Sequence, residues 1–357
     1  MRELTMLPTP GHFVSLHRGR LMIHYTFIVS CRTSLLTLIF ILLFFGLAVP
    51  VQADSSMVDL EEIPSIRPET TNGLQAFFQA LDYNWAELEE GVPPLMLENI
   101  PDDIDRTAST KAKKHAFFMG LLPMILLANQ EIEEERRDVQ HILTRHNSRQ
   151  IQDGDLERLD EILRRYGLLG HPFTDHRVRS RLMRRVDIIP PSLVLAQAAN
   201  ESAWGSSRFA QMGNNLFGEW TYKPGTGIVP AGRPEGATYE VRKFSSIYES
   251  IRSYMNNLNR NGAYRKLREI REKLRESNQP VTGMALARGL AKYSQRGDEY
   301  ISEIQAMIRQ NQLMRVNDAS LRLPETDPHT IIDTSGSGLF SSRSRMIGHR
   351  SPARQDP

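Results

Sequence analysis

The sequence predicts a mainly helical protein that carries one small β-hairpin. Two observations lead to this class. Apolar residues recur every three or four positions in many segments, which is the spacing that gathers side chains on one face of a helix. Residues 218–243 differ, because they are rich in glycine and proline and contain two short β-like pieces, at 227–229 and 238–241. We therefore expect a small hairpin or flap over 218–243 and helices on both sides of it.

The N-terminal half is expected to contain three helices. Apolar positions with helical spacing run through residues 74–88, 109–143 and 155–166. Prolines at 93–94 and 101 separate the first two, because proline lacks the amide N–H that a helix interior needs.

The C-terminal half is expected to contain five helices with recognisable ends. Pro190 and Pro191 follow the first, and Ser192 is placed to cap the second. Ser246 and Glu249 have the spacing of a capping box, which begins the third. The predicted helices cover residues 177–186, 192–201, 246–258, 280–290 and 301–308.

Charge and composition exclude several classes of function. The formal net charge is +2, of which residues 1–53 contribute +3, so the remainder carries −1 and gives no electrostatic reason to expect nucleic acid as a partner. The single cysteine, Cys31, excludes a disulfide framework and cysteine-ligated zinc. The histidines form no HExxH-like pair and no phosphate-binding glycine loop is present, so we expect neither a metal nor a cofactor.

The N-terminus has the pattern of an export signal. Residues 35–49 form a nearly unbroken apolar run after Arg32, and Val51 and Ala53 supply small residues where a signal peptidase would cut. Two outcomes remain open, a cleaved signal peptide or an uncleaved inner-membrane anchor over residues 27–51. Either one predicts an exported protein of the periplasm or cell envelope. Met22 is an alternative start.

We expect four parts along the chain. Residues 1–53 are the signal peptide or anchor, and 54–155 form a helical N-terminal region that begins with a polar linker. Residues 156–316 form a catalytic domain. Residues 317–357, rich in Ser, Arg and Pro without periodicity, form a disordered tail.

The most informative segment is 196–205, followed closely by the glycine-asparagine turn at 213–218. It places Glu201 at the end of a small-residue helix, with Trp204 three positions later. A helix C-terminus and burial both disfavour the charged form, so both would raise the pKa of this carboxyl. A carboxylic acid that stays protonated near neutral pH can protonate a leaving oxygen. Without its neighbours, Glu201 would be taken for an exposed helix-end glutamate.

Residues 175–313 resemble the glucosaminidase family of lysozyme-like hydrolases, glycoside hydrolase family 73. The resemblance implies a mainly helical, α+β lysozyme-like fold and Glu201 as the essential acid. It also implies peptidoglycan glycan strands as the substrate and the activity of an endo-β-N-acetylglucosaminidase. The similar pieces are residues 185–192, 196–205, 213–218, 254–259 and 290–294 with Gly297.

The group that works with Glu201 is less clear. The family is thought to place a second, weaker carboxylate in the flap, where Glu219, Glu235 and Glu240 lie. Strand alternation favours Glu240, which could point into the cleft, whereas Glu235 lies in a Pro-Glu-Gly turn typical of a solvated loop. A further alternative is that none is catalytic and that the 2-acetamido oxygen of the substrate acts as nucleophile. The mechanism, retaining, inverting or substrate-assisted, is left open.

The resemblance also implies a tyrosine near the active site at the position of Tyr293. Its hydroxyl would hold the acetamido group or the attacking water, and the alternative is a core tyrosine with its hydroxyl satisfied. Aromatic rings suit the faces of sugar rings, so we expect Trp204, Phe217, Trp220 and Tyr222 to line the sugar subsites. Trp204 has core packing as an equal alternative. Asn215 is expected at the site as a turn-shaping residue.

Two other functions remain open from the sequence. A lytic transglycosylase also uses one glutamate at a helix end in a lysozyme-like fold. A non-catalytic wall-binding protein would retain the cleft and bind glycan without cleaving it.

Overall fold

The computed structural model describes residues 63–322, all of which belong to one unit of the chain. The predicted signal or anchor over 1–53, the start of the linker and nearly all of the predicted tail lie outside the described residues. Within 63–322, no helix is both long enough and apolar enough to cross a membrane.

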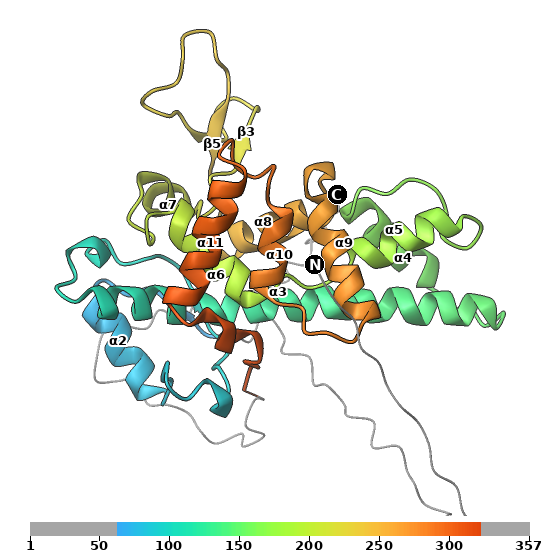
Figure 1. Ribbon diagram of the computed structural model, residues 1–357, viewed down its shortest axis with the longest axis horizontal. Coiled ribbons are helices and arrows are strands. Elements are labelled where there is room, and N and C mark those ends of the chain that lie inside the picture. The colour runs from blue at the N-terminus through green and yellow to red at the C-terminus, as the bar shows by residue number, and fades with distance from the viewer. Residues whose placement is uncertain (1–62, 323–357) are drawn as a thin grey trace, which may run out of the picture. The chain divides into compact units, whose positions relative to one another are not determined.

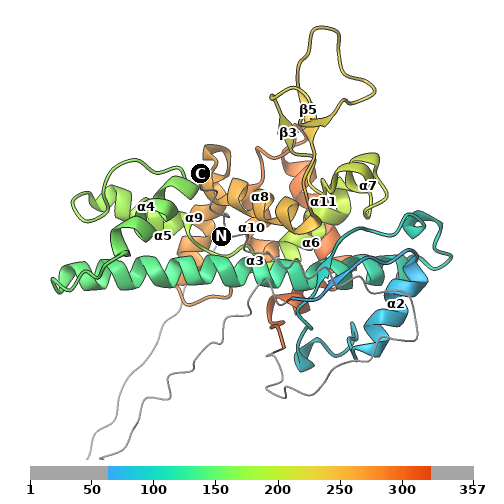
Figure 2. The ribbon, with the colours of Figure 1, turned by 180° about the vertical axis from the view of Figure 1, so that it is seen from behind.

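The N-terminal part combines a small parallel sheet with helices, one of which is much longer than the others (Figures 1 and 2). Its elements are β1 (Ser65–Ile66), α2 (Thr71–Ala80), β2 (Met96–Leu97), α3 (Thr110–Asn147) and α4 (Asp155–Arg165).

The first helix ends at Ala80 rather than near residue 88, so its predicted length was wrong. Asp82 adopts a left-handed backbone with a φ of 47°, which turns the chain. The turn buries Trp85 against α3, where its ring stacks on Phe118 at 5.5 Å between centroids. Burial of the aromatic ring outweighs the local helical spacing.

Helix α3 supports the other helices. Its residues 116–129 are buried, and the helix contacts α2, β2, α4, α6 and α8. Glu131, in the second half of α3, accepts the hydroxyl of Tyr248 of α8. The C-terminal elements are α5 (His176–Arg185), α6 (Pro191–Glu201), α7 (Arg208–Gly213), β3 (Trp220–Thr221), β4 (Gly227–Ile228), β5 (Glu240–Arg242), α8 (Ile247–Arg260), α9 (Arg265–Glu276), α10 (Gly283–Leu286) and α11 (Asp298–Gln310).

Helix α6 is the centre of this arrangement. It packs against α3, α10 and α11, and its residues from Pro191 to Ala199 are buried. Ser192 does not cap the helix as predicted, because α6 begins one residue earlier, at Pro191. Its hydroxyl instead accepts the backbone N–H of Gly283 at 3.1 Å. A Cβ at Gly283 would lie 2.3 Å from that hydroxyl, so the contact between α6 and α10 requires glycine.

The flap is a three-stranded antiparallel sheet, so the predicted hairpin has one strand more than expected. Strand β5 lies in the centre, and Val241 is paired with Trp220 of β3 on one side and Ile228 of β4 on the other. Figure 1 shows the flap standing out from the helices, with its long loop between β4 and β5. The mainly helical class with a small sheet, as expected for a lysozyme-like fold, is confirmed.

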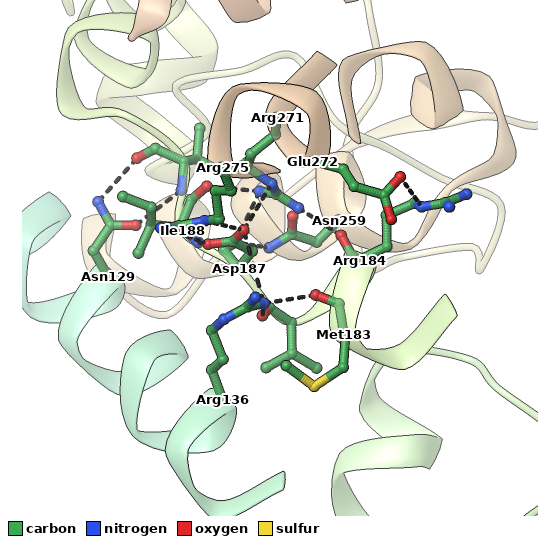
Figure 3. Close-up of polar contacts among 12 residues, drawn as sticks. Asn129, Arg136, Met183, Arg184, Asp187, Ile188, Asn259, Arg271, Glu272 and Arg275 are labelled. Carbon is green, nitrogen blue, oxygen red and sulfur yellow. Dashed lines mark hydrogen bonds and ion pairs between the residues drawn. The ribbon is translucent and has the colours of Figure 1, made fainter. Parts of the chain in front are cut away.

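A buried ion cluster fixes the segment that leads into α6 (Figure 3). The carboxylate of Asp187 accepts hydrogen bonds from Arg275 of α9 at 2.7 and 2.5 Å. The guanidinium groups of Arg271 and Arg136 lie 3.5 and 3.7 Å from the same carboxylate. Arg271, only 1% exposed, also donates to the backbone carbonyls of Asp187 and Ile188.

In this cluster the single carboxylate of Asp187 faces three guanidinium groups. Burial alone would raise the pKa of Asp187, but the nearby guanidinium groups, Arg271 foremost, hold it below its usual range. The cluster therefore keeps an ionised carboxylate inside the protein and ties α3 and α9 to the start of α6.

Candidate active site

Glu201 is the last residue of α6, and the chain turns sharply after it. Ala203 and Trp204 both have left-handed backbones, with φ values of 52° and 63°. The buried hydroxyl of Ser202 closes the turn by donating to the carbonyl of Ala198 and accepting the N–H of Gly205. A Cβ on Gly205 would lie 2.6 Å from Ile100, so this position also requires glycine. The turn leaves the half-buried Glu201 side chain at the helix end.

A chain of hydrogen bonds holds Glu201 in place. Tyr300 of α11 donates its hydroxyl to Oε1 of Glu201 at 2.7 Å. The Nε2 of Gln197, one turn earlier on α6, donates to the oxygen of Tyr300 at 2.8 Å. Tyr254 of α8 donates to Oε1 of Gln197 at 2.5 Å. Each donor in this chain points toward Glu201, and the chain ends on Oε1, which favours Oε2 as the oxygen that carries the proton of a neutral Glu201.

The electrostatics suit an acid. Burial raises the pKa of Glu201, and the hydrogen bonds from Tyr300 and Asn200 only partly oppose that shift. The pKa of Tyr300 is raised too, by burial and then by the adjacent carboxylate, so its hydroxyl stays protonated and remains a donor. The arrangement can therefore deliver a proton from one defined oxygen of a carboxylic acid.

Sequence reasoning missed Tyr254 and Tyr300 as partners of Glu201. Tyr254 was assigned to the apolar face of a helix, and its ring does stack on Phe217 at 3.9 Å. Its hydroxyl also donates to Gln197, and the apolar spacing of the helix does not predict that hydrogen bond. Tyr300 precedes the segment whose apolar pattern marked α11, and only its position in space links it to Glu201.

Tyr293 lies beside this chain without joining it. Its ring stacks on Tyr300 with 5.3 Å between centroids, and its hydroxyl donates to the carbonyl of Phe217 at 3.2 Å. Burial, followed by the neighbouring Tyr300 and Glu201, raises the pKa of Tyr293 well above its usual value. The structure thus brings Tyr293 to the site, and its direct role in catalysis stays a prediction.

Of the four predicted subsite rings, Phe217 is buried and Trp204 is partly buried and packs against the core. Trp204 contacts Phe117 and Phe118 of α3 edge-on, at 6.0 and 5.2 Å, which agrees with the core-packing alternative. Phe217 is 4% exposed. Sugar binding by Trp204 and Phe217 stays a prediction.

The other two rings are open to solvent. Trp220 is 56% exposed and stacks on Tyr239 of the flap at 4.5 Å, and Tyr222 is 70% exposed. These flap rings are accessible to a glycan. Asn215 is buried and works within the turn, because its amide donates to the carbonyls of Glu219 and Arg242 and accepts two backbone N–H groups.

The flap glutamates lie in three different environments. Both oxygens of Glu240 accept backbone N–H groups, from Gly225 at 3.0 Å and Gly227 at 2.8 Å. These bonds lower the pKa of Glu240 and close the turn between β3 and β4. Glu235 is exposed, and Glu219 is half-buried with its pKa raised by burial. A catalytic role for Glu240 stays a prediction, although its contacts are those of a structural carboxylate.

A cavity of about 690 Å³ lies next to the tyrosines. Its lining includes Phe217, Glu219, Trp220, Tyr254, Tyr264 and Tyr293, which we call the flap cavity. Glu201 is not among the residues that line it, but Tyr254 donates to Gln197 and Tyr293 stacks on Tyr300, the two residues of the chain that leads to Glu201. Among residues 63–322, no group of three His, Cys, Asp or Glu side chains is arranged to hold a metal ion.

The comparisons with known proteins show the family to which the chain belongs. The family model described as glucosaminidase, mannosyl-glycoprotein endo-beta-N-acetylglucosaminidase, matches residues 178–313. The chain is 34% identical to Protein bax of Escherichia coli (strain K12) over 210 residues, which cover 59% of this chain and 74% of that protein. The chain belongs to the Bax-like glucosaminidase family. The resemblance expected from the sequence, to glucosaminidases and among them to Bax, is confirmed.

Membership of the Bax-like glucosaminidase family implies a glycosidase domain and a glycan substrate. The matched range contains α6, the flap, α8 and α11, which are the elements that build the site. No solved structure matches the chain at a significant level.

Proposed function

We propose that the protein is a peptidoglycan hydrolase that cleaves the β-1,4 bond after N-acetylglucosamine, with Glu201 as general acid. The observation that supports this most is the hydrogen-bond chain from Tyr254 through Gln197 and Tyr300. It leaves Oε2 of a half-buried carboxyl with raised pKa as the oxygen that carries a proton. A glycosidic oxygen needs that proton when it leaves.

The reaction would proceed as follows. Oε2 of Glu201 gives its proton to the glycosidic oxygen while the C1–O bond breaks, and positive charge develops at C1. Both oxygens of Glu240 are occupied by backbone N–H groups, which favours attack on C1 by the acetamido oxygen of the substrate. Water then attacks C1 and breaks the bond between C1 and the acetamido oxygen, which restores the acetamido group, and the proton that the water releases returns to Glu201. Tyr293 remains a candidate to hold the acetamido group or the water.

The cellular setting is part of the same proposal. The apolar run at 35–49 supports export to the periplasm or cell envelope, with either a cleaved signal or an anchor over residues 27–51. The helical region over 54–155 would position the catalytic domain at 156–316, since α3 packs directly against α6.

Glu201→Gln tests the general acid, because it keeps the shape of the side chain and removes the transferable proton. We expect digestion of purified sacculi to fall by about 10²- to 10⁴-fold. Glu276→Gln is the matched control, since Glu276 is also the last residue of a helix but is exposed. Equal digestion by wild type and Glu201→Gln would refute the assignment.

Mass spectrometry of the products separates the rival functions. The proposed hydrolase gives reducing N-acetylglucosamine ends, whereas a lytic transglycosylase gives anhydromuramic ends. A wall-binding protein would bind sacculi without releasing either product.

A further inference from the structure

Two arginines converge on the turn that follows α4, and both line the flap cavity. Arg185, the last residue of α5, donates from Nη1 to the carbonyls of Tyr166 and Gly167 at 2.6 and 3.1 Å. Arg260, the last residue of α8, packs its guanidinium group against Gly167, where a Cβ would lie 2.5 Å from Nε of Arg260. The turn therefore gathers two guanidinium groups at one edge of the cavity.

These two arginines carry positive charge without a counter-charge. Among residues 63–322, neither guanidinium group has a carboxylate partner. Burial lowers the pKa of Arg185, and the positive charges of Arg181 and Arg260 lower it further. The nitrogens of Arg185 that its two hydrogen bonds leave free are not buried, and Arg260 is exposed, so a ligand can reach both groups. Like charges repel, so a bound anion would stabilise this pair.

The lining of the flap cavity changes along α8. Ser253, which donates its hydroxyl to Glu219 at the start of the flap, and Arg260 both line the cavity. At 1.5 Å per residue, these two positions lie about 10 Å apart along the helix. The flap side includes the exposed ring of Trp220, which suits the face of a neutral sugar. The arginine side suits a carboxylate.

We propose that Arg185 and Arg260 form a carboxylate-binding subsite of the flap cavity, which takes the acidic substituents of a peptidoglycan strand. This inference rests on the proposed function, because it takes peptidoglycan as the ligand. N-acetylglucosamine is neutral and gives the two arginines no partner. Muramic acid carries a lactyl group that ends either in a free carboxylate or in a stem peptide with carboxylates of its own. Guanidinium groups bind carboxylates through paired N–H donors, so the subsite would favour peptidoglycan over chains of N-acetylglucosamine alone.

The test changes Arg260, because its side chain is exposed and makes no hydrogen bond within the described part of the chain. Calorimetry measures binding to the full chain that carries Glu201→Gln, which suppresses turnover. We expect Arg260→Gln to weaken binding of acidic glycan tetramers by roughly 3- to 10-fold, and Arg260→Glu to weaken it further, because the charge is first removed and then reversed. Binding of a neutral N-acetylglucosamine tetramer should not change.

Two acidic tetramers distinguish the sources of the carboxylate. Both alternate N-acetylglucosamine with N-acetylmuramic acid, and one has free lactyl carboxylates whereas the other carries stem peptides. A loss with the first tetramer assigns the lactyl carboxylate to the subsite, and a loss confined to the second assigns the stem peptide. High salt should reduce either loss, because mobile ions screen exposed charges.

The controls separate this inference from the proposed function. Arg309→Gln should leave binding unchanged, because Arg309 is exposed in the last turn of α11 and does not line the flap cavity. Thermal unfolding checks that each variant is folded. Equal affinity of the parent and both Arg260 variants for the acidic tetramers would overturn the inference, as would an equal loss with the neutral tetramer.

The parent protein supplies the last distinction. A parent that binds none of the three tetramers overturns the inference, while sacculus digestion by wild type would still support hydrolysis. The expected binding pattern without digestion would refute hydrolysis alone.

Discussion

The two ends of α6 each present a carboxyl group, and the protein treats them in opposite ways. Asp187, just before the helix, is ionised among guanidinium groups that lower its pKa. Glu201, at the last residue, faces hydroxyl and amide groups and has a raised pKa. Both side chains are removed from water to a large extent. Burial raises the pKa of both carboxyls, and only the guanidinium groups around Asp187 reverse that shift, whereas the hydrogen bonds to Glu201 do not.

Removing the ionised carboxyl should have the largest effect on stability. Asp187→Ala leaves the buried Arg271 without its counter-charge, so we expect a loss of about 3–5 kcal/mol in the free energy of unfolding. Urea unfolding at pH 7 measures it. Because the folded pKa of Asp187 is lowered, its contribution is complete above the unfolded value of about 3.9 and is lost as the pH falls through the folded pKa.

The difference between wild type and Asp187→Ala should therefore shrink when unfolding is repeated at pH 3. A difference that is the same at both pH values would mean that the charge of Asp187 is not what stabilises the segment before α6.

Tyr300→Phe should have an intermediate effect. It removes the donor to Oε1 of Glu201 and costs roughly 0.5–1.5 kcal/mol of stability. In the wild type the hydrogen bond from Tyr300 lowers the pKa of Glu201. Its loss should therefore raise that pKa, and the pH at which activity falls on the alkaline side should increase. Carbon-13 NMR titration and a pH–rate profile measure the two shifts. Tyr293→Phe is the control, because the hydroxyl that it removes donates to the carbonyl of Phe217 and not to Glu201, so the pKa of Glu201 should not move. Equal pKa shifts in both variants would contradict the hydrogen-bond chain.

The smallest effect on stability is expected from Glu201→Gln. It should increase the free energy of unfolding, whereas Asp187→Ala should decrease it. A raised folded pKa means that the folded state resists ionisation of Glu201, so wild type loses stability as the pH rises from the unfolded value toward the folded one. Glutamine carries no charge and escapes that penalty. The variant should equal wild type near pH 4 and exceed it at pH 7 in urea unfolding. A variant that is less stable than wild type at pH 7 would show that ionisation of Glu201 does not destabilise the folded state.

Local patterns were sufficient for some of the site. The alanines within 196–199 favour a helix and Gly205 permits a left-handed backbone, so α6, its end at Glu201 and a turn after it are expected from neighbours in the sequence. The flap was placed correctly by its composition, but its strand count and the contacts of Glu240 were not. The alternation of side chains along a strand predicts which face of the sheet Glu240 lies on. It does not predict which backbone N–H groups will donate to its carboxylate.

The sequence by itself determined the helical class, the family, and the position of the acid at the end of α6, because each depends on short-range spacing. Tertiary structure alone decided the rest. Tyr300 and Tyr254 lie 99 and 57 residues from the side chains to which they donate, and Ser253 lies 34 residues from Glu219. Hydrogen bonds act over about 3 Å, so the hydrogen-bond partners of Glu201 and Glu219 are set only when helices α6, α8 and α11 and the flap meet.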